Sequence, residues 1–376
     1  MLTLQPSIKN GRNVWDVEAL PKEEFQGRVR RLQTAMADKG LDLALVYGMA
    51  FNGNADPRYL SNIAPRMTDG SGVAVPRDGD PVAFFEGAMR GLPSYKRITW
   101  VEDLRGGGDT ATMFARYLEE TQAKCVGLVG VRPQMPFKQY RRLREALAGR
   151  LVSEHNSMVS DLRRVKSERE LRCIRKAGAV VAAIFAALSG PTLKPVERVI
   201  EAEGRLAARF QGAEDVRLLL LRPGEWALKQ AGDGQIAKGE RILVYAAAEL
   251  DRYWAEAARP FVGTGNGLAP VEAGTAGTAY QAMLRAVIAG NKADTPRGAA
   301  AEAAAHAGIH LDDDYGYGNG LGLSLDEAPA IGHGSTGIFE PGMAVSCRLF
   351  TKQQGGLLLG DTLIIRSQGN EIVTQM

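Results

Sequence analysis

The sequence predicts two domains that combine helices and strands: an α/β domain over residues 1–158 and an α+β domain over residues 159–376. With 376 residues, the chain is too long for one ordinary hydrophobic core, so two domains are expected. Strand-like and helix-like patterns alternate through the first part, which is typical of an α/β layer. Near the end, the segment Tyr315–Ile365 combines closely spaced glycines with apolar, strand-like runs. Because glycine allows close backbone approach and positive φ, this segment predicts a sheet that wraps around a ligand.

Composition and charge exclude several classes of partner. Hydrophobic residues make up 45% of the chain and charged residues 24%, as is typical of a globular protein. A net charge of +3 is too small to indicate a nucleic-acid surface. No apolar run approaches the roughly 20 residues that span a bilayer, so no membrane partner is expected. The 3 cysteines show no CxxC spacing and the N-terminus shows no secretory signal pattern, and these two features predict a cytoplasmic location.

The first domain is predicted to begin with a helix over residues 22–39. Pro21 precedes this helix, acidic residues occupy its first turn and Gly40 follows it. Further along, apolar runs predict buried strands, and amphipathic patterns predict helices between them. The strands are expected at Leu41–Val46, Gly72–Pro76, Pro81–Glu86, Ile98–Val101 and Cys125–Val131, and the helices at Thr110–Thr121 and Phe137–Ala148.

The second domain is predicted to begin with a long helix. Ser167 and Glu170 have the spacing of a capping box, and apolar residues recur at helical spacing from Leu171 to Ile184. A second helix is predicted over Pro195–Phe210, and both helices are expected to pack behind a curved sheet. Strands are predicted at Gly239–Tyr245, Tyr253–Phe261, Met343–Phe350 and Gly356–Arg366, and further helices at Ala269–Ala289 and Gly298–Ala307.

Several motifs of the second domain resemble those of the "pita-bread" family, which contains methionine aminopeptidase, prolidase, Xaa-Pro aminopeptidase and creatinase. The segment Gly318–Pro329 resembles the family pattern G-H-G-(I/L)-G-L-x-x-H-E-x-P. Gly239–Tyr245 resembles G-D-x-V-x-x-D, and Tyr253–Phe261 resembles Y-x-x-D-x-x-R-x-F. The E-P-G-M and E-D-T patterns lie over Glu340–Met343 and Gly360–Thr362. The resemblance implies a creatinase-like N-terminal domain, a pita-bread C-terminal domain and a homodimer, in a layout most like creatinase or Xaa-Pro aminopeptidase.

The resemblance also implies where metal ions bind in metal-dependent family members, which hold two divalent ions with two Asp, one His and two Glu. In this sequence, those positions carry Tyr245, Glu256, Asn319, Arg348 and Gly360. The interval between Tyr245 and Glu256 equals the family's interval between its two metal-binding Asp residues. Only Glu256 keeps a group that binds metals, and Arg348 adds a permanent cation, so we expect no bound dication and no metal cofactor.

The first hypothesis for function is a metal-independent, creatinase-like enzyme. It would hydrolyse a C–N bond, or perform a related lyase reaction, in a small nitrogenous substrate that bears a carboxylate. Arg348 and Asn319 are candidates for substrate binding, because a guanidinium can clamp a carboxylate through two hydrogen bonds. The candidate catalytic residues, which would act as a base or as hydrogen-bond donors, are Tyr245, Glu256, Asp326 and Glu327. In the first domain, Arg58 and Tyr59 resemble a family turn that can reach an active site and bind substrate, although an ordinary turn at a strand end is an equal interpretation.

The second hypothesis is a non-catalytic descendant that binds a small ligand, a peptide or a protein partner. In this interpretation, Arg348 replaces the charge of the lost metals and pairs with Glu256, which keeps the former cavity neutral. Buried polar groups cost free energy unless they are paired, so a site without function is expected to acquire apolar residues. Most of the ligand positions carry polar residues instead, which favours the enzyme. A structural pair of Arg348 and Glu256 would select the same residues, so the sequence leaves both hypotheses open.

Overall fold

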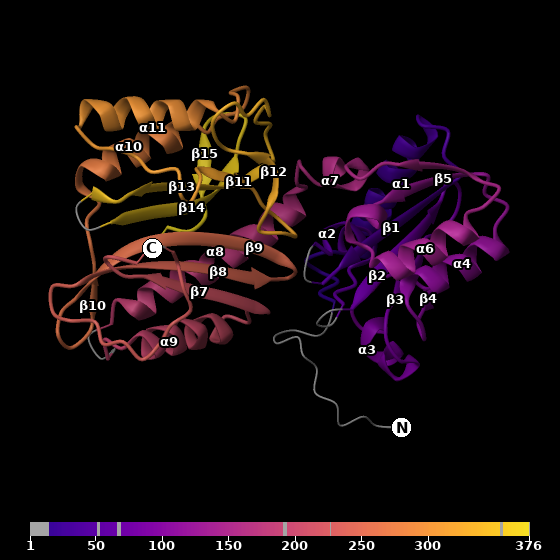
Figure 1. Ribbon diagram of the computed structural model, residues 1–376, viewed down its shortest axis with the longest axis horizontal. Helices are drawn as coiled ribbons and strands as arrows, with labels where there is room; N and C mark the ends of the chain where they lie inside the picture. The colour runs from indigo at the N-terminus through magenta and orange to yellow at the C-terminus, as the bar shows by residue number, and fades with distance from the viewer. Residues whose placement is uncertain are drawn as a thin grey trace. The chain divides into compact units, whose positions relative to one another are not determined.

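The structure is a computed structural model that describes residues 15–50, 53–65, 69–190, 194–225, 227–353 and 356–375. The chain forms two compact units, Met1–Arg163 and Arg164–Met376 (Figure 1). The N-terminal segment on which the predicted cytoplasmic location partly rests lies outside the described residues. No helix within the described ranges is both long and apolar enough to cross a membrane.

The first unit is built on a six-stranded mixed sheet. Its strands are β1 (Leu43–Met49), β2 (Gly70–Pro76), β3 (Val82–Phe85), β4 (Leu104–Arg105), β5 (Cys125–Val129) and β6 (Leu151–Glu154), in the order β4-β3-β2-β1-β5-β6. Its helices are α1 (Lys22–Ala37), α2 (Ala55–Ser61), the 3-10 helix η1 (Met89–Gly91), α3 (Leu92–Lys96), α4 (Thr110–Glu120), α5 (Val131–Gln134), α6 (Phe137–Ala146) and α7 (Met158–Leu162). Phe114 of α4 and Leu143 of α6 share a core with Leu45 and Phe84 of the sheet. This arrangement confirms the predicted α/β layer.

One predicted strand of this unit is wrong. Residues 98–101 form no strand, and β4 pairs with β3 instead. The side chains of Thr99 and Trp100 donate hydrogen bonds to backbone carbonyl groups of α2, at 2.6 and 2.7 Å. The segment is therefore buried by packing against a helix, and a short apolar run cannot distinguish this from burial in a sheet.

The second unit is built on a nine-stranded sheet. Its strands are β7 (Asp215–Leu221), β8 (Arg241–Leu250), β9 (Tyr253–Gly263), β10 (Leu268–Pro270), β11 (Gly318–Gly320), β12 (Glu327–Ala330), β13 (Ala344–Thr351), β14 (Leu357–Ile365) and β15 (Asn370–Ile372). The strand order is β12-β11-β13-β14-β9-β8-β7, with β10 paired to β9 and β15 paired to β14. Its helices are α8 (Glu168–Leu188), α9 (Glu197–Phe210), α10 (Gly274–Arg285) and α11 (Thr295–His306). The predicted capping box is confirmed, because Ser167 and Glu170 exchange side-chain to backbone hydrogen bonds at the start of α8.

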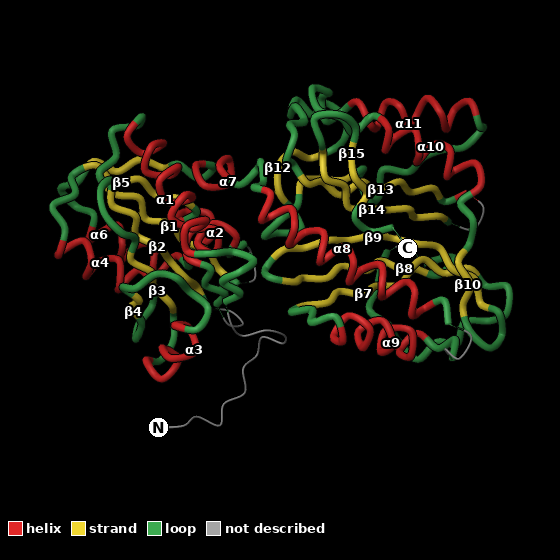
Figure 2. Tube along the Cα trace, turned by 180° about the vertical axis from the view of Figure 1, so that it is seen from behind, coloured by secondary structure: helices red, strands yellow, loops and turns green. Residues whose placement is uncertain are grey.

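Two helix pairs cover one face of this sheet. Helices α8 and α9 pack on β7–β9, where Ile184 contacts the same core as Leu218, and α10 and α11 pack on β13 and β14, where Met283 shares a core with Cys347 (Figures 1 and 2). Successive side chains of a strand point to opposite faces, so the neighbours of these core residues lie on the other face. We call that other face the inner face. Its positions include Arg217, Leu243, Tyr245, Trp254, Glu256, Ser346, Arg348 and Phe350.

Candidate functional site

The residues at the predicted ligand positions meet at the centre of the inner face. Tyr245 on β8 lies opposite Ala258 on β9, and Arg348 on β13 lies opposite Gly360 on β14. Gly360 in turn lies opposite Ala258, so these four residues form one row across four neighbouring strands. Small residues occupy the middle of the row, which leaves space for Tyr245 and Arg348 both to reach Glu256.

Arg348 joins two of these residues through its guanidinium. Its Nη1 donates a hydrogen bond to Glu256 Oε1 at 2.5 Å, and its Nη2 donates to Asn319 Oδ1 at 2.7 Å. Asn319 is fixed in this orientation because its Nδ2 donates to the carbonyl oxygens of Gly320 and Leu325, each at 2.7 Å. Both terminal nitrogens of the guanidinium, which we call the fork of Arg348, are therefore already hydrogen-bonded to side-chain oxygens of the protein.

Glu256 is enclosed by protein donors. It is only 2% exposed, and Tyr245 donates its hydroxyl hydrogen to Oε2 at 2.5 Å. Ser346 Oγ and Arg348 Nη1 both donate to Oε1. The backbone amide and carbonyl of Glu256 hydrogen-bond the hydroxyl of Thr362, each at 2.9 Å. Both carboxylate oxygens are thus occupied, and the strand that carries them is fixed.

Tyr245 is a hydrogen-bond donor in this centre. Burial and the neighbouring Glu256 carboxylate raise the pKa of Tyr245 well above its ordinary value, and the positive charges of Arg348 and Arg217 oppose that rise. At neutral pH the phenol therefore keeps its proton. It can donate to negative charge but cannot serve as a base.

The residues of the centre do not fit a pair of divalent metal ions. Of the side-chain oxygens that could bind a metal here, Glu256 Oε1 and Asn319 Oδ1 each accept a hydrogen bond from Arg348, and Glu256 Oε2 accepts one from Tyr245. Zn²⁺ and other dications need several anionic or imidazole ligands, and a guanidinium repels them. Across the described part of the chain, no group of three or more His, Cys, Asp and Glu side chains is arranged to hold a metal.

Two of the predicted catalytic residues lie at the end of the turn that joins β11 to β12. Asp326 is exposed in the turn before β12. Glu327 is buried and forms an ion pair with Lys166, with Nζ and Oε2 3.0 Å apart and both side chains at most 3% exposed. Glu327 also accepts a hydrogen bond from the backbone of Ser324, so it fastens the β11–β12 turn to the segment before α8.

Arg58 and Tyr59 belong to α2 of the first unit. Tyr59 is fully buried, and Arg31 Nη2 donates to its hydroxyl at 2.6 Å. That hydroxyl donates to the carbonyl oxygen of Leu162 at 3.3 Å. Tyr59 therefore has partners inside its own unit, and the binding role of Arg58 and Tyr59 stays a prediction.

Ser346 is a residue of the centre that the sequence reasoning did not select. It precedes Arg348 by two positions on β13 and so points to the same face. Applying strand alternation to the predicted strand Met343–Phe350 would have placed Ser346 beside Arg348. Ser346 does not fall on a family ligand position, so the family motifs alone do not indicate it.

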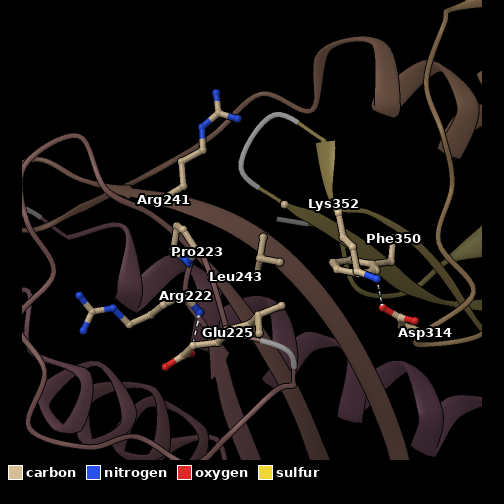
Figure 3. A pocket seen from close by; sticks show the side chains of 11 residues that line it. Arg222, Pro223, Glu225, Arg241, Leu243, Asp314, Phe350 and Lys352 are labelled. Carbon is tan, nitrogen blue, oxygen red and sulfur yellow. Dashed lines mark hydrogen bonds and ion pairs between the residues drawn. The ribbon is translucent and has the colours of Figure 1, made fainter.

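A pocket of about 360 Å³ lies next to the centre on the inner face (Figure 3). Leu243 precedes Tyr245 by two positions and Phe350 follows Arg348 by two, so both continue the same face. Together with Leu221 they belong to one apolar cluster, which forms the floor of the pocket. The rim is charged, and Lys352 pairs there with Asp314 at 2.7 Å. The remaining lining residues are Arg222, Pro223, Gly224, Glu225, Arg241 and Gly356. The guanidinium groups of Arg222 and Arg241 point away from Leu243 in Figure 3. A volume of this size suits a small organic ligand.

Two family models match the sequence, and together they cover both units. The model "Metallopeptidase family M24" matches residues 172–367, and "Creatinase/Prolidase N-terminal domain" matches residues 28–165. No curated protein sequence matches the chain.

Solved structures share the fold over nearly the whole chain. The Xaa-Pro dipeptidase from Bacillus anthracis is 19% identical with a TM-score of 0.77, covering 94% of this chain and 98% of that chain. The X-Pro aminopeptidase from Thermotoga maritima is 19% identical with a TM-score of 0.78, covering 93% and 97%. The N-terminal domain of the FACT complex subunit SPT16 from Cicer arietinum (chickpea) is 15% identical with a TM-score of 0.68, covering 93% and 96%. At these identities, the likeness shows the fold alone.

Proposed function

The chain belongs to metallopeptidase family M24, and we propose that it is a metal-independent member that binds a small, carboxylate-bearing ligand on the inner face and does not hydrolyse peptides through two metal ions. The observation that carries this proposal is the fork of Arg348. Arg348 stands at a position that the resemblance assigns to a metal ligand, and it donates to Glu256 and Asn319 at two more of these positions. A guanidinium supplies positive charge there without supplying a Lewis acid or a metal-bound water.

The same geometry favours a binding role over turnover. A general base needs an available lone pair close to the substrate. Both oxygens of Glu256 accept hydrogen bonds from the protein, Asp326 is exposed, and Glu327 is paired with Lys166. Of the predicted catalytic residues, Tyr245 remains, and it is a donor.

The pocket beside Tyr245 supports a second candidate, a metal-independent C–N hydrolase or lyase of the creatinase type. A ligand on the apolar floor formed by Leu243 and Phe350 would lie two strand positions from Tyr245 on the same face. Tyr245 could then donate a hydrogen bond to negative charge that develops in the ligand. This candidate requires Glu256 to release a protein donor when the ligand binds.

An activity assay combined with native mass spectrometry tests the proposal. Purified protein is incubated with Mn²⁺, Co²⁺ or Zn²⁺ and assayed on Xaa-Pro dipeptides and on creatine. We expect no metal-stimulated peptide hydrolysis, no turnover of creatine and a small anionic mass retained by the protein. Metal-dependent dipeptide cleavage would overturn the proposal, and metal-independent turnover of creatine would favour the second candidate. The same spectra report whether the chain forms the homodimer that we propose.

A further inference from the structure

Arg217 on β7 shares the inner face with the centre. It lies opposite Ala247 on β8, and Ala247 lies opposite Glu256 on β9, so the three residues form a row across three strands. Side chains directly opposite one another on neighbouring strands point to the same face. The methyl group of Ala247 fills little of the space between its neighbours. The guanidinium of Arg217 can therefore extend over Ala247 toward β9.

Trp254 supports the guanidinium in that position. The guanidinium carbon of Arg217 lies 5.1 Å from the centroid of the Trp254 ring, a cation–π contact. Trp254 itself is 6% exposed, whereas Arg217 is exposed to solvent. Stacking on an indole uses the flat face of a guanidinium and leaves the N–H groups on its edge available. Arg217 thus presents an oriented hydrogen-bonding edge above the sheet.

Arg217 forms no ion pair with a carboxylate within the described ranges, and its side chain contacts the ring of Trp254. Arg348 differs in this respect, because Glu256 and Asn319 both engage its fork. Arg217 is close enough to the centre for its charge to act on the phenol of Tyr245. Of these two arginines of the inner face, Arg217 is the one whose donors face solvent.

We propose that Arg217, held on Trp254, is the carboxylate-binding group of the inner face and that it selects anionic over neutral ligands. This inference rests on the proposed function, and it moves the anion-binding role from Arg348 to Arg217. A carboxylate that binds the edge of Arg217 places the rest of a short ligand over Ala247 and toward Tyr245. Arg217 and Trp254 are absent from the set that the sequence predicted, because neither falls on a family ligand position.

Isothermal titration with a matched pair of probes tests this inference. N-acetylglycine carries a carboxylate and a nitrogen, and N-acetylglycinamide has the same shape without the charge. Both are titrated at low ionic strength into the wild-type chain and into Arg217→Gln, Arg217→Lys and Arg172→Gln. Arg172 is an exposed residue on α8, so its substitution changes the net charge equally without altering the inner face.

We expect the wild type to bind N-acetylglycine at least about tenfold more tightly than the amide, since a charge-assisted, two-bonded arginine contact is lost with the amide. Arg217→Gln should abolish this preference, Arg217→Lys should keep part of it, and Arg172→Gln should keep all of it. An unchanged preference in Arg217→Gln, or no preference in the wild type, would overturn the inference. Failure of the proposed function would appear differently, as bound divalent metal or metal-dependent peptide hydrolysis in the same preparation.

Discussion

Arg348 and Glu256 form an ion pair in the middle of the second unit's sheet, with Nη1 and Oε1 2.5 Å apart and the two side chains 21% and 3% exposed. Tyr245, Ser346 and Asn319 complete the hydrogen bonds of this pair. A buried charge pair contributes little net stability when it is intact, but removing one partner leaves an uncompensated charge. The pair therefore makes the centre sensitive to single substitutions.

Arg348→Ala is expected to destabilise the second unit strongly. It leaves the Glu256 carboxylate buried without its counter-charge, which typically lowers the free energy of unfolding by about 3–5 kcal/mol. Urea unfolding measured by circular dichroism gives this value. Arg172→Ala is the control, and its effect should stay within about 0.5 kcal/mol because the residue is exposed. An Arg348→Ala chain as stable as the control would contradict a structural role for the pair.

Tyr245 is expected to make the stability of the chain fall at alkaline pH. Its folded pKa lies well above its ordinary value of 10.0, through burial and the Glu256 carboxylate. The folded state therefore holds the phenol proton more tightly than the unfolded state does. The resulting stabilisation is fully present below about pH 10 and is lost as the pH rises toward the folded pKa.

Spectrophotometric titration of tyrosine ionisation in the native state checks this expectation. The difference between the wild type and Tyr245→Phe should be absent around pH 10 and should appear only at higher pH. If Tyr245→Phe instead removes a tyrosine that ionises near pH 10, the phenol is not enclosed as described.

Asp326 and Glu327 are neighbours in sequence but should respond differently to amide substitution. Glu327→Gln leaves the Lys166 ammonium buried without its carboxylate, so we expect a loss of about 3–5 kcal/mol in the free energy of unfolding. Asp326→Asn changes an exposed side chain and should stay within about 0.5 kcal/mol, with binding of N-acetylglycine unchanged. A large loss of N-acetylglycine binding in Asp326→Asn, at normal stability, would contradict this prediction and show that Asp326 contributes to ligand binding.

The resemblance to family motifs predicted the fold of the second unit and the meeting of the central residues. Tyr245 and Glu256 fall on adjacent antiparallel strands, and the interval between them brings both side chains to one face. Spacing could not show that Glu327 pairs with Lys166, because these residues are 161 positions apart in the chain. Nor could it show that residues 98–101 are buried by a helix, because apolar runs of that length suit either kind of packing.

The roles of the individual polar residues depended on contacts that a sequence does not contain. Arg348 was a candidate substrate clamp, and only its two hydrogen bonds show that the protein already engages its fork. Arg217 matches no family motif, so its place beside the centre follows from the β7–β8 register alone. The sequence could therefore predict that Tyr245, Glu256, Asn319 and Arg348 lie together, while Ser346, Arg217 and the hydrogen bonds of the centre had to come from the structure.

Metal content is the measurement that tests the central claim most directly. Purified protein is incubated with excess Mn²⁺, Co²⁺ and Zn²⁺ in turn, dialysed and analysed by inductively coupled plasma mass spectrometry, with Arg348→Ala treated alongside. Because a guanidinium lies between Glu256 and Asn319, we predict only sub-stoichiometric metal in the wild type. Retention of about two metal ions per chain, the content of a two-metal hydrolase, would contradict the account.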